Sequence, residues 1–286
     1  MKRYLLLLAI VCLSCQPQPR DYFDHVAPND LKMPKPKPGE WLDSHHESGQ
    51  NLMMFKLSNP LVPNDSVNMI HIKPIGIFNA LQQKQLDLTC EYLSLFFQLN
   101  TEIGSEIPES AIPESARRIG LEGHEQMLAG YILDSLLKKE KPPKAIAVMG
   151  LSKFDLYPKP EWNYVFGLAS YQDHVGVSSI FRFQDGQLTE ANFNLCLLRL
   201  IKVSSHEIGH MFGLHHCIDA QCVMNGTNNI NETDQNPVRL CSYCQRKLHS
   251  SLQYDHRKRL LDLEAFFKRN KLEEAADLMR KDLDAI

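Results

Sequence analysis

The sequence HEIGHMFGLHH, residues 206–216, decides the fold of this chain. It fits the pattern H-E-x-x-H-x-x-G-x-x-H. On a helix, His206 and His210 lie four residues apart on one face, so both imidazoles can reach one Zn²⁺ ion. Gly213 can adopt the left-handed conformation that ends a helix, and the chain can then bring back His216 as a third ligand. Three protein ligands leave a fourth position open, which is typical of a catalytic zinc site.

The acid within this motif has a separate role. Glu207 projects beside the face that carries the two histidines, where it can contact a water molecule at the metal without being a ligand. We therefore expect Glu207 to act as the general base that activates this water for peptide-bond hydrolysis and then returns the proton to the leaving nitrogen. The neighbouring His215 has the wrong spacing for a third ligand, which favours His216.

Four cysteines follow the third histidine at spacings of C-x4-C and, after a gap, C-x2-C: Cys217, Cys222, Cys241 and Cys244. This pattern predicts a closed tetrahedral site for a second, structural Zn²⁺, which would fix the loop that carries His216. We thus expect two zinc ions per chain. Two disulfides are the alternative, and export of the protein would permit them.

Upstream of the motif, predicted strands and helices alternate. The predicted strands cover residues 67–76, 145–151, 162–171 and 175–183. The predicted helices cover residues 79–100, 123–141 and 192–211. Downstream, residues 255–286 are amphipathic and predict two helices with a break near Asn270. This order indicates an α/β (α+β) fold, with a mixed sheet, an active-site helix and a smaller, loop-rich and helical C-terminal part, over residues 67–286.

The chain opens with a predicted targeting segment. Residues 1–15, MKRYLLLLAIVCLSC, place a short basic region before an apolar stretch too short to span a bilayer. The segment resembles a bacterial lipoprotein signal, in which the cysteine after the cleavage point, here Cys15, carries the lipid. We expect the protein to be exported and anchored by lipid, rather than by a span, at the outer membrane or the periplasmic side of the cell envelope.

Residues 16–66 are rich in proline, with Pro34, Pro36 and Pro38 at alternate positions. Such a run blocks helix and central strand and predicts an extended tether or a surface wrap.

Composition excludes some classes of protein. The 286 residues include 31 basic and 34 acidic side chains, a formal charge of -3, so no global basic field is available to hold nucleic acid. No run of eighteen apolar residues occurs, which excludes a multi-span membrane protein.

The run from His206 to Cys244 resembles the archaemetzincins, a family of metzincin-type zinc peptidases. The cysteine directly after the third histidine, and Cys222-Val223-Met224, separate this family from other metzincins. Residues 155–158, 162–170 and 175–183 also look like the family, so the resemblance covers about residues 68–250.

The resemblance implies a metzincin fold, with a twisted sheet and helices above a cleft and a smaller part below. It implies that Met224 forms the methionine turn, a hydrophobic floor beneath the three histidines. It also implies that strand 175–183, or the strand just before it, edges the cleft and pairs with an extended substrate.

We therefore expect a zinc-dependent metallopeptidase that acts on a peptide or protein substrate, with exopeptidase and endopeptidase action both open. The alternative is a non-catalytic, zinc-stabilised binding module at the cell envelope. The intact Glu207 argues against it, because a purely structural site has no use for a general base.

Overall fold

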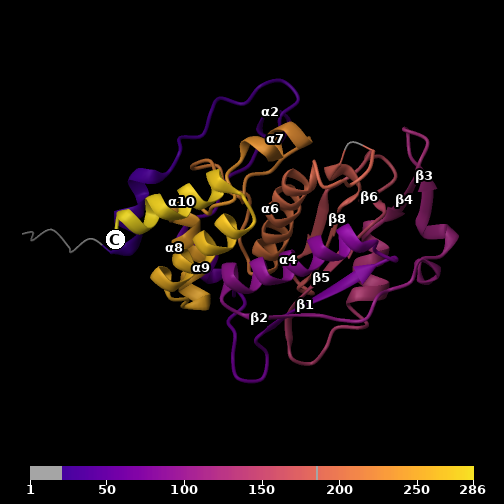
Figure 1. The fold of residues 1–286 in the computed structure, drawn as a ribbon, viewed down its shortest axis with the longest axis horizontal. Coiled ribbons are helices and arrows are strands. Elements are labelled where there is room, and N and C mark those ends of the chain that lie inside the picture. The colour runs from indigo at the N-terminus through magenta and orange to yellow at the C-terminus, as the bar shows by residue number, and fades with distance from the viewer. Residues whose placement is uncertain (1–20, 185) are drawn as a thin grey trace, which may run out of the picture.

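The computed structural model describes residues 21–184 and 186–286 (Figure 1). The predicted signal segment, with its Cys15, lies outside the described residues. Within the described residues, no helix is both long and apolar enough to cross a membrane.

A five-stranded mixed sheet carries the site, with the strand order β2-β1-β5-β8-β7. All eight residues of the central strand β5 are buried, as the apolar run at 145–151 predicts. The four strands from β2 to β8 are parallel, and β7 runs antiparallel at the edge. The strand bounds are β1 (Met69–Ile75), β2 (Asn100–Ile103), β5 (Ala145–Ser152), β7 (Gly167–Ser170) and β8 (Val175–Ser179).

A second, three-stranded sheet corrects one prediction. It consists of β3 (Arg117–Ile119), β4 (Glu125–Leu128) and β6 (Asp155–Tyr157). The helix predicted over 123–141 is wrong at its start, because residues 125–128 pair with β6 instead. The fully buried Gln126 donates a hydrogen bond from Nε2 to Oδ2 of Asp155 at 2.7 Å, a long-range contact that local periodicity does not reveal. Helical structure begins only with α5 (Ala129–Tyr131) and a π-helix (Ile132–Leu137).

Two long helices lie side by side over the five-stranded sheet (Figure 1). They are α4 (Ala80–Phe97) and α6 (Phe193–Met211), and both confirm helices predicted from the sequence. Asn79 begins α4 with a capping box that it shares with Gln82. Side chains from α4, α6 and the strands form the main hydrophobic core, which fixes α6, the helix of the motif, against the sheet.

Helices α8 (Ser242–Leu252), α9 (His256–Arg269) and α10 (Glu273–Asp284) gather at the end of the molecule away from the three-stranded sheet (Figure 1). The break predicted near Asn270 is confirmed, because α9 ends at Arg269 and α10 begins at Glu273. Two further helices, α7 and α8, were not predicted. The bounds of α7 are Ile230–Gln235.

The N-terminal segment, residues 21–66, runs along the outside of the C-terminal half (indigo in Figure 1). Phe23, Val26 and Phe55 are buried, so the segment packs against the core. Its helices are α1 (Tyr22–Val26), a 3₁₀ turn (Ala27–Asn29), α2 (Trp41–Ser44) and α3 (Leu52–Leu57). Three other 3₁₀ turns lie further along the chain, at Glu109–Ala111, Glu114–Ala116 and Phe181–Phe183.

Candidate active site

The C-terminal turns of α6 present the motif. The helix ends at Met211, and Gly213 follows with a φ of +94°, the left-handed conformation expected from the sequence. The backbone N–H of Leu214 donates to the carbonyl of Gly209 at 3.0 Å and closes the helix end. The chain then turns and brings His216 back toward the helix.

Three imidazoles converge at this point, and we call them the histidine site: His206, His210 and His216. One ring nitrogen from each lies within 4.8 Å of the others. The Nε2 atoms of His206 and His210 are 2.9 Å apart. His215 does not join this group, and its ring packs edge-on against Tyr171 at 5.6 Å.

The outer nitrogen of each imidazole has an acceptor. Nδ1 of His206 lies 2.8 Å from the carbonyl oxygen of Val223, and Nδ1 of His210 lies 2.6 Å from that of Leu214. Nδ1 of His216 lies 2.6 Å from Oε1 of Glu47. A proton on each Nδ1 leaves the Nε2 lone pair free to bind a metal.

The charge state of the rings also suits a metal. Burial, together with the nearby His216, lowers the pKa of His206 to about 3. Burial lowers the pKa of His210 well below its usual value. Both rings are therefore neutral at pH 7, as zinc ligands must be. Three imidazoles with oriented Nε2 atoms fit a Zn²⁺ ion with an open fourth position.

Glu207 lies beside the histidine site and is only 7% exposed. Burial raises the pKa of its carboxyl group to about 8 in the absence of a metal. Its side chain rests against the backbone of Gly167 in β7, so closely that a Cβ atom there would lie 2.5 Å from Oε1. Glycine at 167 therefore makes room for the carboxylate.

A cavity of about 590 Å³ lies over the histidine site, and Glu207 is part of its wall. Of the two strands that the resemblance offered as the cleft edge, β7 is the one at the sheet edge and in the cavity wall. Trp162 and Tyr164 line the cavity, and Phe166 both lines it and is buried in the core. The aromatic lining residues are Trp41, Trp162, Tyr164, Phe166 and Tyr171.

One buried cation also lines the cavity. Nζ of Lys202 donates to the carbonyl oxygens of Thr233 and Asp234, each at 3.1 Å. Burial lowers the pKa of Lys202 to about 8.

Met224 lies fully buried against α6. A Cβ atom at Gly209 would lie 2.5 Å from Sδ of Met224, so this glycine lets the methionine approach the helix between the two motif histidines. The carbonyl of Met224 accepts from the backbone N–H of Cys217 at 2.8 Å. Met224 is thus in contact with the helix of the motif and is joined through its backbone to the first cysteine.

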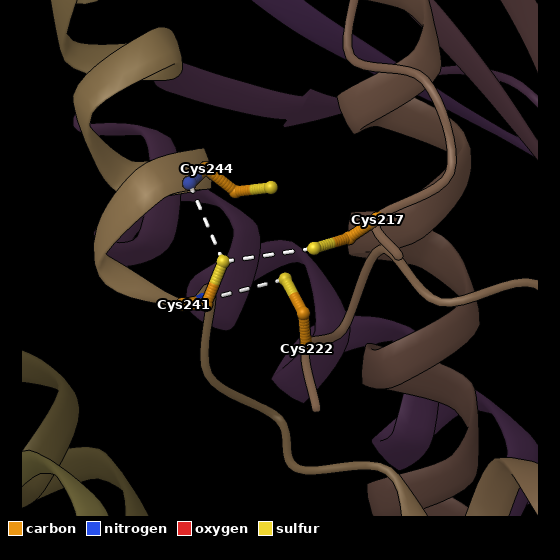
Figure 2. Close-up of side chains that lie close together, drawn as sticks. All are labelled: Cys217, Cys222, Cys241 and Cys244. Atoms are coloured by element: carbon orange, nitrogen blue, oxygen red, sulfur yellow. Dashed lines mark hydrogen bonds between the residues drawn. The ribbon is translucent and has the colours of Figure 1, made fainter. Parts of the chain in front are cut away.

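The four cysteines of the sequence motif also converge, and we call them the cysteine site (Figure 2). Their sulfur atoms lie within 4.8 Å of one another, and all four residues are buried. The sulfurs of Cys217 and Cys241 are 3.7 Å apart, far beyond the 2.05 Å of a disulfide. Within the described residues, Cys217, Cys222, Cys241 and Cys244 form no disulfide.

The chemistry of the cysteine site fits a cation. Backbone N–H groups point at two sulfurs, with Cys241 N 3.3 Å from Sγ of Cys222 and Cys244 N 3.5 Å from Sγ of Cys241. Hydrogen bonds from the other three thiols, Cys222 first, lower the pKa of Cys217. Burial raises the pKa of Cys222. A Zn²⁺ ion at this position would allow all four sulfurs to bind it as thiolates.

Sequence reasoning missed several residues around the histidine site. Glu47 and Trp41 come from the proline-rich segment, where no periodic pattern marks a buried face. Tyr171 places its hydroxyl 2.7 Å from Nδ1 of His210. The sequence offered only one signal for Trp41 and Glu47: a tryptophan and a carboxylate occur in a segment without a periodic hydrophobic pattern.

Comparison with known proteins agrees with this geometry. A family model described as Peptidase family M54 matches residues 127–250. Archaemetzincin-2 of Macaca fascicularis is 33% identical over 251 residues, which cover 76% of this chain and 69% of the relative. Archaemetzincin of Pyrococcus furiosus is 32% identical over 186 residues, which cover 65% of this chain and 94% of the relative.

The crystal structure of archaemetzincin from Methanopyrus kandleri matches with a TM-score of 0.53 and 28% identity. The match covers 68% of this chain and 100% of that chain. The mixed α/β fold and the family resemblance expected from the sequence are both confirmed. The chain belongs to the archaemetzincin family, peptidase family M54, and is a zinc metallopeptidase.

Proposed function

We propose that this metallopeptidase holds two Zn²⁺ ions per chain, a catalytic ion at the histidine site and a structural ion at the cysteine site. The observation that carries the proposal is the convergence of three imidazoles beside the buried Glu207, on the wall of one cavity. The cysteine site is closed by four buried sulfurs and offers no open position, which suits a structural ion.

Glu207 serves as the general base in this proposal. A zinc ion held by His206, His210 and His216 would lower the pKa of water and polarise the carbonyl of the scissile peptide bond. The Glu207 carboxylate accepts a proton from the attacking water and gives it to the leaving nitrogen as the bond breaks. Its contact with Gly167 holds the carboxylate beside β7, so the proton acceptor and an extended substrate meet at the same edge.

The substrate class follows from the cavity. The edge strand β7 lines it and, among the described residues, pairs in the sheet only with β8. An extended peptide can add to the free side through backbone hydrogen bonds. The aromatic lining favours an apolar side chain next to the scissile bond.

The test is a peptide-library digest read by mass spectrometry, with the Glu207→Gln variant as control and zinc measured in both proteins. We expect cleavage by the wild type only, with kcat lowered at least 10²-fold in the variant because the proton acceptor is lost. Equal cleavage by the variant would contradict the role of Glu207. No cleavage by either protein, with two zinc ions in each, would favour the zinc-stabilised binding module.

For the location, we propose that residues 1–15 direct export and that Cys15 carries a lipid. The basic start, the short apolar stretch and the cysteine at its end support this. Residues 16–66 would then link the anchor to the peptidase domain at 67–286. The Cys15→Ala variant should leave the membrane fraction, and unchanged membrane association would contradict the proposal.

A further inference from the structure

A segment near the N-terminus supplies a carboxylate to the histidine site. We call residues 41–52 the strap, which carries α2 and the first residue of α3. Within it, Oε1 of Glu47 accepts a hydrogen bond from Nδ1 of His216 at 2.6 Å, across 169 positions of the chain. The family model matches residues 127–250, so the strap lies outside the matched residues.

This contact differs from those of the other two imidazoles. His206 and His210 each face a neutral backbone carbonyl, whereas His216 faces a carboxylate. A carboxylate at Nδ1 fixes the tautomer and the ring orientation and makes Nε2 a stronger ligand. Glu47 itself is not in the group of side chains whose ligand atoms lie within 4.8 Å of one another, so it acts from outside the ligand set.

Glu47 is held in place from one side by Trp41. Nε1 of Trp41 donates to the same Oε1 of Glu47 at 2.7 Å. The indole ring meets the His216 ring edge-on at 5.0 Å and rests on Gly226, where a Cβ atom would lie 2.5 Å from the ring. The backbone N–H of Trp41 donates to Oε1 of Glu232 at 2.8 Å, which fastens the strap to α7.

Contacts beyond Glu47 fasten the other end of the strap. Nε2 of Gln50 donates to the carbonyl of Gly213 at 2.8 Å, just before the loop that carries the third histidine. Nζ of Lys247 donates to the carbonyl of Gln50 at 3.0 Å, and the backbone N–H of Leu52 donates to the hydroxyl of Tyr243 at 3.1 Å. Both partners belong to α8, the helix that begins at the cysteine site. The strap is therefore fixed at both ends, and these contacts hold Glu47 beside His216.

We propose that the strap is a working part of the metal centre. Glu47 is a positioning residue that orients His216 as the third ligand and offsets part of the positive charge of the ion, and Trp41 holds Glu47 in place. The peptidase domain is then incomplete without a segment that precedes it. This inference rests on the function proposed above and adds a requirement for metal retention.

The test uses the full chain and measures zinc affinity by competition with a chromophoric chelator. Glu47→Ala removes both the negative charge and the hydrogen-bond acceptor, whereas Glu47→Gln removes the charge and keeps an acceptor oxygen. The matched control is Glu40→Gln, which removes a carboxylate that accepts from the backbone of Lys37 in the same segment. We expect the affinity of the histidine site for zinc to fall about 10- to 100-fold in Glu47→Ala and less in Glu47→Gln. Glu40→Gln should match the wild type.

The cysteine site is the internal reference, because its zinc should stay bound in every variant. Loss of both ions in Glu47→Ala would indicate a folding defect, and Trp41→Phe then decides, since it removes the N–H that holds Glu47 and keeps an aromatic ring at this position. Weaker zinc binding at the histidine site alone in Trp41→Phe supports the inference, and wild-type affinity overturns it.

Activity separates this inference from the proposed function. We expect Glu47→Gln to lower kcat with KM nearly unchanged, because the residue acts through the metal rather than on the substrate. Zinc affinity in Glu47→Ala equal to that in Glu40→Gln would overturn the strap proposal and leave the peptidase intact. Weaker zinc binding in Glu47→Ala, with no cleavage by the wild type, would uphold the strap and refute the peptidase mechanism.

Discussion

At the scale of single residues, Gly167 decides where the Glu207 carboxylate can lie. A methyl group there would come within 2.5 to 2.8 Å of three Glu207 side-chain atoms. Because these atoms end a flexible side chain, Gly167→Ala should fold normally but displace the carboxylate. We expect kcat to fall about 10²-fold, as for misplacement of a catalytic group by about 1 Å. Gly130→Ala is the control, because nothing lies within 4 Å of its added Cβ atom.

Steady-state cleavage of a library-derived peptide, with urea unfolding alongside, checks this prediction. Equal kcat in the two alanine variants would show that the close contact with Gly167 does not position the base.

A second residue-scale prediction concerns Lys202, whose pKa is lowered by burial from 10.5 to about 8. Between these values the unfolded chain binds more protons than the folded protein, so the free energy of unfolding rises with pH across that window. Lys202→Met removes the titrating group. The stability of the wild type relative to the variant should therefore increase from pH 8 to pH 10.5 in urea unfolding. A pH-independent difference between the two proteins would refute this.

At the scale of elements, the cysteine site joins three pieces of chain. Cys217 directly follows His216, Cys222 lies two residues before Met224, and Cys241 caps the start of α8. Structural zinc binding is worth on the order of 10 kcal/mol in zinc-finger peptides. Loss of one ligand should therefore remove much of the stability of a domain whose total is about 5–15 kcal/mol.

Cys241→Ser tests this link. We expect one zinc ion fewer and a large fall in the melting temperature. Cys196→Ser is the control, because Cys196 is buried outside the cluster and its Sγ lies near the carbonyl of Phe183, where a hydroxyl can also donate. A similar melting temperature for both variants would contradict a structural role for the cysteine site.

The sequence could predict the elements whose pattern is local. The histidine spacing identifies α6, the glycine at 213 identifies the turn that follows its end, and the apolar run identifies β5. Strand β4 was missed because its pairing with β6 depends on the distant Asp155. The contact of Glu47 with His216 spans 169 positions, and no local pattern reports a contact of that range.

At the scale of the whole molecule, the two ends of the described chain meet around Arg239. Its guanidinium donates to both carboxylate oxygens of Asp282 in α10, at 2.6 and 2.9 Å, and to Asp30 of the N-terminal segment at 2.6 Å. Arg239 lies shortly before the second cysteine pair, and its carbonyl accepts from the backbone N–H of Val223 at 2.9 Å. The network thus connects both ends of the chain to the loops around the metal sites.

Asp282→Ala breaks this buried network and leaves Arg239 without its main counter-charge. We expect the free energy of unfolding to fall by about 3–5 kcal/mol, as for a buried ion pair that loses one partner. Asp284→Ala, at an exposed position of the same helix, should lower the free energy of unfolding by less than about 0.5 kcal/mol. Urea unfolding of both variants checks this. Equal decreases in the free energy of unfolding would mean that the Arg239 network contributes little to stability.

The central claim is that one chain holds two zinc ions of different kinds, an open site for chemistry and a closed site for structure. Diffraction from crystals of the purified protein, recorded at the zinc absorption edge, tests it most directly. We expect two anomalous peaks per chain, one among the rings of His206, His210 and His216 and one among the four cysteine sulfurs. A single peak at the cysteines, with none among the histidines in protein that cleaves peptides, would contradict the account.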